Sequence, residues 1–291
     1  MAKLWTFRDT PGCVDPDSWF CLEYSLFPEH SFEMHFHDFT EIVIVRHGHG
    51  LHLFEDRKYA LAAGDVFVIT PNEVHGYDDI EGLDLCNIMF DFKRFDISDS
   101  DLQHLPGFHA LFHLEPAFRL ERGLTSKFRL SKEQMLHLFH NLVAPLEEEY
   151  RDRPPACESM MHAYLTLVIG YLSRNYVEQA TPASPELLGL SRVRSFIESN
   201  YQDDISLQDL ADIACMSKNT LLRAFTKYYG GSPIKYLIHY RLTKASDLLR
   251  EGNSSVTDVA YAVGFSDSSY FARQFQKAYR LTPREFRKRA T

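Results

Sequence analysis

Three histidines and one glutamate in the first third of the chain are the residues whose types and spacing best fit chemistry. His35, His37 and Glu41 lie two and four residues apart, and such positions share one face of a continuous strand. His75, four residues after Pro71, adds a third imidazole from a later segment. Imidazole and carboxylate groups bind divalent ions such as Zn, Ni, Fe or Mn, and they also hydrogen-bond hydroxylated ligands. A metal site, a metal-free ligand pocket and mutual satisfaction within a β domain are therefore the three interpretations.

A ligand pocket here would draw on further polar side chains of the same segment. Our candidates for effector contacts are His35, His37, Glu41, Arg46, His75 and Tyr77. Arg46 has the opposite parity to His35, so a regular strand would turn it outward. The possible metal ligands are His35, His37, Glu41 and His75. No cofactor is required in the metal-free interpretation.

A second group of residues repeats near the C-terminus at an offset of about 50 residues. Asp209-Leu210-Ala211 is matched by Asp258-Val259-Ala260, and Ser232-Pro233 by Thr282-Pro283. Each copy predicts a short helix, at 206–214 and at 255–263, then a tight turn and a second helix. Ser217 and Ser266 are the expected N-caps of the second helices, because a short hydroxyl accepts from free N–H groups of the first turn. The pattern predicts two helix-turn-helix units.

The second helix of each unit is expected to expose side chains that contact DNA. In the first unit these are Lys218, Asn219, Thr220, Leu222, Arg223 and Lys227. In the second unit they are Asp267, Ser268, Ser269, Arg273 and Lys277. Arginine pairs with guanine, asparagine with adenine and serine or threonine with either, while lysine contacts phosphate. Double-stranded DNA is therefore the expected macromolecular partner.

The elements that must position these groups divide the chain into four segments. Short apolar runs broken by turn signals predict an antiparallel β domain over about residues 20–95. Apolar residues at helical spacing predict helices over 131–150 and 158–178. The expected boundaries are 1–128 for the β domain, 129–178 for a helical connector, 179–188 for a linker and 189–291 for the DNA-binding domain.

The charge is distributed unevenly along the chain. The net charge is −9, but residues 190–291 carry 16 lysines and arginines against 10 acidic residues, which gives +6 and leaves −15 for the remainder. An acidic sensor joined to a basic DNA-binding domain is the simplest interpretation. The five cysteines form no C-x-x-C pair, and neither a signal peptide nor a membrane span is evident, so we expect free thiols, no membrane association and a cytoplasmic location.

Residues 195–287 resemble the DNA-binding domain of the AraC family of transcription regulators. The most specific stretch is DVAYAVGFSDSSYFARQFQKAYRLTPREFR. The resemblance implies base contacts from Asn219, Leu222 and Arg223 in the first unit and from Asp267, Ser268, Ser269 and Arg273 in the second. One departure is Arg280, where the family usually has glycine, as Gly230 stands in the first unit. A non-glycine residue at a left-handed helix end is destabilising by about 1 kcal/mol.

The N-terminal cluster is similar to the two motifs of the cupin superfamily, in which such residues can ligate a divalent metal. The stretch HDFTEIVIVRHGHGLHLFEDRKYALAAGDVFVI further resembles the sensors of rhamnose-responsive AraC-family regulators. That resemblance implies a sugar effector, such as L-rhamnose or a related monosaccharide, and an activator that contacts RNA polymerase. The implied fold class is α+β: a cupin-like β-barrel, then an α-helical dimerisation segment, then an all-α domain with two helix-turn-helix units.

The apolar faces of the helices at 131–150 and 158–178 have two interpretations, packing on their own barrel or dimerisation. Sensors of this family commonly dimerise through such helices, so we expect a homodimer. The expected seam consists of Leu138, Leu142, Tyr164, Leu165, Val168 and Leu172. Two other classes of protein compete with a ligand-controlled regulator. A metal-dependent enzyme fused to a DNA-binding module would need an acid/base pair or nucleophile beyond the His/Glu cluster, and none is evident. An effector-independent DNA-binding protein would leave the polar cluster without a role. We therefore expect a regulator and no enzyme.

Overall fold

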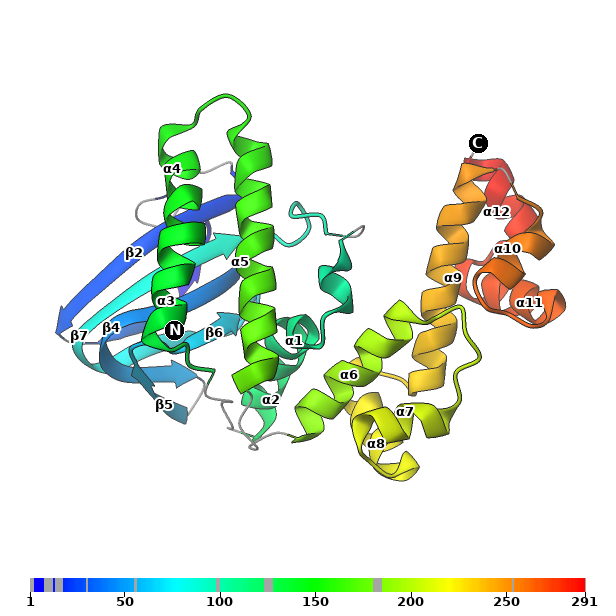
Figure 1. Cartoon of the computed structure of the whole chain (residues 1–291), viewed down its shortest axis with the longest axis horizontal. Helices are drawn as coiled ribbons and strands as arrows, with labels where there is room; N and C mark the ends of the chain where they lie inside the picture. Colours follow the sequence, from blue (N-terminus) through cyan, green and yellow to red (C-terminus); the bar gives the residue numbers. More distant parts are fainter. Residues whose placement is uncertain are drawn as a thin grey trace. The chain divides into compact units, whose positions relative to one another are not determined.

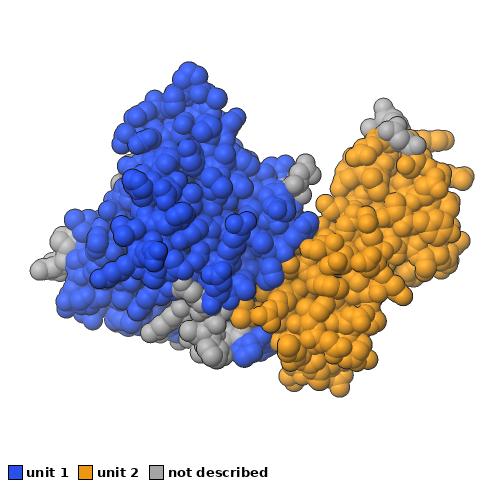
Figure 2. Space-filling model, viewed as in Figure 1, with its two compact units in different colours: residues 1–187 blue, residues 188–291 orange. Residues whose placement is uncertain are grey.

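The computed structural model describes residues 3–7, 13, 18–29, 31–54, 57–97, 100–122, 128–179, 185–252 and 254–290. The chain divides into two compact units, residues 1–187 and residues 188–291 (Figure 2). Residues 180–184 of the expected 179–188 linker lie outside the described residues. Helix α6 (Pro185–Ser199) begins within the expected linker. Residues 185–188 are therefore helical and not a linker.

The described part of unit 1 contains a mixed sheet of seven strands (Figure 1). They are β1 (Lys3–Trp5), β2 (Phe20–Glu29), β3 (Phe32–His37), β4 (Thr40–Phe54), β5 (Arg57–Ala62), β6 (Val66–Ile69) and β7 (His75–Phe90). The strands from β2 to β7 pair antiparallel, as predicted. Strand β1 pairs parallel with β3 and was not foreseen.

The two long strands β4 and β7 pair with each other along most of their length and connect the two halves of the sheet. The late half of β7 pairs with β2, and the early half of β4 pairs with β6. The early part of β7 pairs with β3, and the late part of β4 pairs with β5. Between these halves the register shifts at residues 45–51, where bulges bend the strands. Gly48 and Gly82 have φ of 74° and 56° here, and a Cβ on Gly48 would lie 2.0 Å from the Gly82 carbonyl oxygen.

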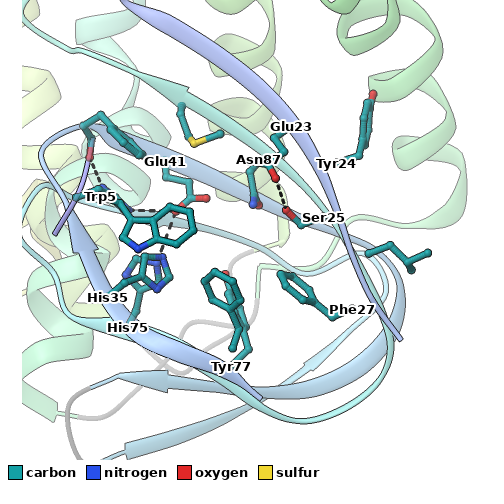
Figure 3. Close-up of a pocket in the computed structure, with 15 residues that line it drawn as sticks. Trp5, Glu23, Tyr24, Ser25, Phe27, His35, Glu41, His75, Tyr77 and Asn87 are labelled. Carbon is teal, nitrogen blue, oxygen red and sulfur yellow. Dashed lines mark hydrogen bonds and ion pairs between the residues drawn. The ribbon is translucent and has the colours of Figure 1, made fainter. Parts of the chain in front are cut away.

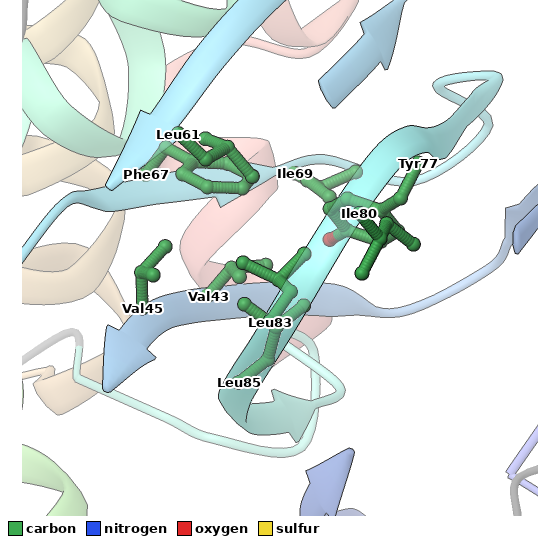
Figure 4. Packing of buried hydrophobic residues seen from close by; sticks show 9 residues of the cluster. All are labelled: Val43, Val45, Leu61, Phe67, Ile69, Tyr77, Ile80, Leu83 and Leu85. Atoms are coloured by element: carbon green, nitrogen blue, oxygen red, sulfur yellow. The ribbon is translucent and has the colours of Figure 1, made fainter. Parts of the chain in front are cut away.

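One apolar cluster joins the strands of unit 1 (Figure 4). Its members come from β4 to β7 and are Val43, Val45, Leu61, Phe67, Ile69, Tyr77, Ile80, Leu83 and Leu85. Each of these side chains is at least nine-tenths buried. Burial of a large aliphatic or aromatic side chain contributes roughly 1.5–3 kcal/mol to folding, so this cluster holds the curved sheet in shape.

Helices follow the sheet in unit 1. They are a 3₁₀ turn at Asp101–His104, α1 (Pro106–His109), a π turn at Ala110–Leu114, α2 (Glu115–Arg122), α3 (Lys132–Leu138), a π turn at Phe139–Val143, α4 (Ala144–Asp152) and α5 (Cys157–Gln179). Helices α3 to α5 confirm the two predicted helices, and Ser131 and Gln134 form a capping box at the start of α3. The helical stretch from Asp101 to Arg122, α2 included, was not predicted from the sequence and lies within the segment 1–128 that was expected to be the β domain.

Four of the six residues of the expected dimer seam pack inside the single chain, while Leu142 and Tyr164 are half-buried. Leu138, Leu165, Val168 and Leu172 are completely buried within the single chain. These four side chains therefore pack inside unit 1 and are not free to contact a second copy. Two other apolar side chains point outward instead. Leu136 on α3 is 72% exposed, and Leu167 on α5 is 52% exposed.

Unit 2 is helical throughout its described part. Its helices are α6 (Pro185–Ser199), α7 (Leu207–Ala214), α8 (Lys218–Tyr229), α9 (Pro233–Glu251), α10 (Val256–Ala262), α11 (Ser268–Tyr279) and α12 (Pro283–Ala290). The predicted short helices at 206–214 and 255–263 correspond to α7 and α10. Helix α9 connects the pair α7 and α8 to the pair α10 and α11. It packs with α10 and α11 through Leu242, Leu249 and Phe271.

Candidate DNA-recognition helices and ligand pocket

The first helical pair has the turn expected of a helix-turn-helix unit. Ser206 and Asp209 form a capping box at the start of α7. Cys215 ends α7 in the left-handed conformation, with φ of 53°. Ser217 caps α8 by accepting from the backbone N–H of Thr220, as predicted. The chain therefore turns within the three residues 215–217, which fixes α8 against α7.

The second pair repeats this geometry with different residues at two points. Gly264 occupies the left-handed position with φ of 89°, and a Cβ there would lie 2.6 Å from the Gln202 carbonyl oxygen. The prediction that Ser266 caps the second helix is wrong. Asp267 is the N-cap, and its Oδ1 accepts from the N–H of Ser269 at 2.7 Å. The cap lies one residue later than in the first unit because the repeat carries an extra residue there.

The structure confirms that Arg280 stands at a helix end where the family usually has glycine. Arg280 ends α11 in the left-handed conformation with φ of 60°, at the position where Gly230 ends α8 with φ of 72°. The two C-caps therefore have the same backbone geometry, although only one of them is glycine.

The predicted DNA-contact residues lie on the faces of α8 and α11 opposite the core. Leu221, Ala224 and Phe225 bury one face of α8, and Phe271 and Phe275 bury the matching face of α11. The exposed candidates are Lys218, Asn219, Arg223, Lys227, Asp267, Ser269, Arg273 and Lys277. The half-buried candidates are Thr220, Leu222 and Ser268. Both helices thus present a polar, mainly basic surface.

A cavity of about 290 Å³ opens among the strands of unit 1 (Figure 3). It is lined by Trp5, Glu23, Tyr24, Ser25, Leu26, Phe27, Phe32, His35, His37, Phe39, Glu41, His75, Tyr77, Asn87 and Met89. Five of the six predicted effector residues are in this set. The volume is at the lower end of the range for small-molecule sites.

Three pocket histidines are held in the same way. The Nδ1 atoms of His35, His37 and His75 lie 2.8 to 3.1 Å from backbone carbonyl oxygens two residues away. A carbonyl oxygen only accepts, so in each ring Nδ1 carries the hydrogen. Each Nε2 is therefore available for another partner, and Glu41 supplies one: its Oε2 lies 3.1 Å from His37 Nε2 and 3.7 Å from His75 Nε2.

Burial sets the charge state of several groups in the pocket. It lowers the pKa of His35 and lowers the pKa of His75 well below its usual value. Burial also raises the pKa of Glu23 to about 7, and raises the pKa of Tyr77 well above its usual value. Desolvation disfavours the charged form of each group. At neutral pH these two imidazoles and the phenol are therefore uncharged hydrogen-bonding groups.

The structure narrows the possible metal set from four residues to three. Potential ligand atoms of His37, Glu41 and His75 all lie within 4.8 Å of one another, and this is the metal-competent group among the described residues. His35 is not part of it, although its ring centre is 4.1 Å from that of His75. Two imidazoles with Nδ1 tied to carbonyls and one carboxylate fit a divalent transition metal. These three residues would hold such an ion.

Arg46 is the effector candidate that the structure places elsewhere. Its Nη1 lies 3.5 Å from Asp84 Oδ1, and its guanidinium lies over the rings of Tyr24 and Phe139. The pocket lining does not include Arg46. The side chain points toward the helices because it has the opposite parity to the inward residues of β4, which is the outcome the strand alternation indicated.

Several pocket residues were missed by the sequence analysis. Trp5 is one, because β1 was not predicted. Glu23 and Asn87 face each other as register partners on β2 and β7. Their signal was a polar residue inside an apolar run. His52 was also missed, although it does not line the cavity: it is buried behind it, beside the rings of His75 and Tyr77, and burial lowers its pKa well below the usual value.

Comparisons with known proteins agree with both parts of the chain. Residues 210–289 match a family model described as a helix-turn-helix domain, and residues 20–165 match one described as an AraC-like ligand binding domain. The second match spans half of the chain. This chain belongs to the AraC family of transcription regulators. The family expected from the sequence is thereby confirmed.

Relatives of this AraC-family regulator match it along most of its length. The HTH-type transcriptional activator RhaS of Pectobacterium carotovorum is 30% identical over 263 residues, which is 90% of each chain. The protein of the same name from Escherichia coli is 31% identical over 261 residues, or 89% of each chain. Both matched domains are regulatory, so the chain is a regulator and not an enzyme.

The solved structures that the chain resembles include two that cover about a third of it. An AraC-type regulator from Chromobacterium violaceum is 31% identical with a TM-score of 0.34, covering 35% of this chain and 92% of that one. The DNA-binding domain of AdpA, solved with a target DNA, is 27% identical with a TM-score of 0.34, covering 35% and 91%. In the part of the chain that the structure describes, no helix has the length and apolar character needed to cross a membrane.

Proposed function

We propose that this AraC-family regulator activates transcription in response to a small sugar bound in the cavity of unit 1. The observation that carries the proposal is the combination, in one small cavity, of convergent polar groups and aromatic walls. His35, His37, Glu41, His75 and Asn87 present hydrogen-bonding atoms to it. Relatives over nearly the full length are named transcriptional activators.

The chemistry of the lining fits a monosaccharide. A sugar ring offers several hydroxyls around its edge and C–H groups on its faces, so it needs polar partners and apolar walls together. The rings of Trp5, Phe27, Phe32 and Tyr77 supply the walls. L-rhamnose and related six-carbon sugars are the first ligands to test, as the similarity to rhamnose-responsive sensors implies.

Unit 2 supplies two recognition helices to double-stranded DNA in this proposal. Arg223 on α8 and Arg273 on α11 contact bases, and the neighbouring lysines contact phosphates. Helix α9 has 19 residues and is therefore roughly 28 Å long. A spacer of that length suits two helices that enter successive major grooves on one face of B-DNA, about 34 Å apart.

A homodimer and a contact with RNA polymerase complete the proposal. The outward side chains of α3 and α5, Leu136 and Leu167, are the exposed apolar positions that a second copy would cover. A dimer would place two DNA-binding domains on neighbouring half-sites. Sugar binding controls transcription by changing the population of the state that binds DNA or contacts the polymerase, which requires different sugar affinities in the two states.

Sugar binding without a metal is the version of the proposal that we favour. The Nε2 atoms and the Glu41 carboxylate hydrogen-bond sugar hydroxyls directly in this version. A divalent ion held by His37, Glu41 and His75 would instead polarise a ligand oxygen. The two versions differ in their response to a chelator, which makes them separable by experiment.

Thermal unfolding of the full chain with a panel of monosaccharides, first in EDTA and then with added Zn²⁺ or Ni²⁺, tests the proposal. A sugar at 100 times its dissociation constant adds about 2.7 kcal/mol to the free energy of unfolding. We expect a sugar-dependent rise in Tm in EDTA, which His75→Gln abolishes. A rise that needs metal would replace the metal-free version. No rise with any sugar in either condition would overturn the sugar proposal.

A further inference from the structure

Helix α11 exposes an aromatic ring among its polar side chains. In the described part of unit 2, the large apolar or aromatic side chains that are exposed are Tyr261 on α10, at 55%, and Tyr270 on α11, at 37%. Two other rings of α11, Phe271 and Phe275, are completely buried. Tyr270 therefore presents an aromatic surface on the helix that carries the proposed base contacts of the second unit.

The Tyr270 ring lies beside Arg273. Side chains three positions apart on a helix are neighbours on its surface. The guanidinium carbon of Arg273 lies 5.9 Å from the centre of the Tyr270 ring. The same ring lies 6.0 Å from that of Phe265, which is 4% exposed and belongs to the apolar core of α9, α10 and α11. Phe265 thus connects Tyr270, and through it Arg273, to the rigid part of unit 2.

This contact restricts the side chain of Arg273. A guanidinium is attracted to the face of an aromatic ring and stacks on it. An exposed arginine without such a neighbour samples many rotamers, and binding then requires it to lose that freedom. Because Tyr270 lies on the same helix, the attraction is present before DNA binds. The ring therefore favours a subset of the positions that Arg273 could adopt.

The first unit has the same arginine without the ring. Arg223 on α8 corresponds to Arg273 on α11 at an offset of 50 residues, and at the same offset Thr220 corresponds to Tyr270. The Thr220 hydroxyl lies 2.9 Å from Ser217 Oγ, which also accepts from the Thr220 backbone N–H. Thr220 therefore belongs to the helix cap and offers no ring to its arginine. The two units differ in how the arginine is supported.

We propose that Tyr270 is a positioning residue for Arg273 and raises the selectivity of the base contact made by the second helix-turn-helix unit. The inference rests on the proposed function, in which Arg273 pairs with a base. A planar guanidinium donates to O6 and N7 of guanine together only when it lies in the plane of the base. A ring that restricts the guanidinium favours this bidentate geometry over looser contacts with other bases. The contribution of an exposed cation–π contact corresponds to about a two- to fivefold preference.

Competition binding of the full chain to one DNA site and its single-base variants tests the proposal. The site is first selected from a random library with the wild-type chain. Arg273→Ala then identifies the base pair at which preference depends on this arginine, and Arg223→Ala identifies the other. We expect Tyr270→Ala to reduce the preference for guanine at the Arg273 base pair by about two- to fivefold. The preference at the Arg223 base pair should stay unchanged.

Three further variants separate the ring from other features of Tyr270. Tyr270→Phe keeps the ring and should retain the wild-type preference. Tyr270→Thr reproduces the residue of the first unit and should give the same loss as Tyr270→Ala. Tyr261→Ala, which removes the other exposed tyrosine, is the matched control and should change no preference. Chemical denaturation of each variant establishes that it is folded under the binding conditions.

The possible failures of the proposal are distinguishable. If Tyr270→Ala weakens binding equally for every base, or if Tyr270→Phe behaves like Tyr270→Ala, this inference alone is overturned. The second result would assign the effect to the hydroxyl and not to the ring. If Arg273→Ala relaxes preference at no base pair, the proposed base contact of Arg273 fails, and the role of Tyr270 fails with it.

Discussion

Glu41 Oε2 lies 3.1 Å from His37 Nε2, while Nδ1 of the same ring lies 2.8 Å from the carbonyl oxygen of Phe39. The carbonyl can only accept, so Nδ1 carries a hydrogen. Nε2 of the ring faces the carboxylate, whose remaining lone pairs can accept from a ligand hydroxyl. The pair connects the turn between β3 and β4 to the cavity.

Glu41→Gln is expected to weaken sugar binding. Hydrogen bonds to a charged group contribute about 1.5–3 kcal/mol, so the dissociation constant should rise roughly 10- to 150-fold. Isothermal titration with the full chain measures the change. Glu33→Gln is the matched control, because Glu33 is exposed on the neighbouring strand β3. Equal affinities of Glu41→Gln and wild type would show that this carboxylate does not contact the sugar.

The free energy of unfolding should fall as the pH is lowered from 7 to 5. Burial holds the folded-state pKa values of His35, His52 and His75 below 6.5, so the unfolded chain binds more protons in this range. Each of these histidines lowers the free energy of unfolding by up to about 1.4 kcal/mol for every pH unit below its unfolded-state pKa. His52→Gln should flatten the profile measured by urea denaturation at a series of pH values.

Glu23 has the opposite effect on the pH dependence of stability between pH 5 and pH 7. Its pKa is raised from 4.5 to about 7 on folding, so the folded chain binds the extra proton between these values and this contribution to stability is lost as the pH rises. The groups around Glu23 are Ser25, which hydrogen-bonds it, the Glu41 carboxylate and the facing Asn87. Glu23→Gln should therefore steepen the loss of stability from pH 7 to 5. A shallower profile would contradict the assignment.

Arg280→Gly is expected to stabilise unit 2 by about 1 kcal/mol. Arg280 is left-handed at the end of α11, and glycine removes the clash between Cβ and the following carbonyl. The reciprocal change, Gly230→Ala at the end of α8, should be destabilising by a similar amount. Chemical denaturation of both variants measures the two effects. A loss of stability in Arg280→Gly would indicate that the arginine side chain makes a compensating contact.

Arg223→Ala and Arg273→Ala should each weaken binding to a specific DNA site by about 1–3 kcal/mol and relax base preference at one position. Both side chains are exposed on the recognition helices. Fluorescence anisotropy at fixed salt, with the specific site and a random sequence compared, measures the change. Equal losses on both DNAs would assign the arginine to phosphate contact.

The DNA-binding unit could be predicted almost completely from the sequence, and the pocket only in part. Helix α8 was predictable because capping and apolar spacing are local signals: Ser217 supplies the cap, and Leu221 and Phe225 supply the spacing. Ser266 misled because an extra residue moved the cap to Asp267. The positions of Trp5, His52 and Asn87 depend on which strands pair. Trp5 pairs with His37, His52 with Tyr77 and Asn87 with Glu23, which are 32, 25 and 64 positions away, and pairing at such separations leaves little local signal. Arg46 shows that alternation along a strand was the better guide than residue type.

Sugar-dependent transcription tests the central claim most directly. DNA sites are first selected from a random library with the full chain, and transcription from a template carrying the selected site is then measured in vitro with RNA polymerase. We predict that a neutral sugar raises transcript yield with the wild-type protein, and that His75→Gln, which binds the same DNA, gives no response. Yields that are independent of every sugar, or an unchanged response in His75→Gln, would contradict the account.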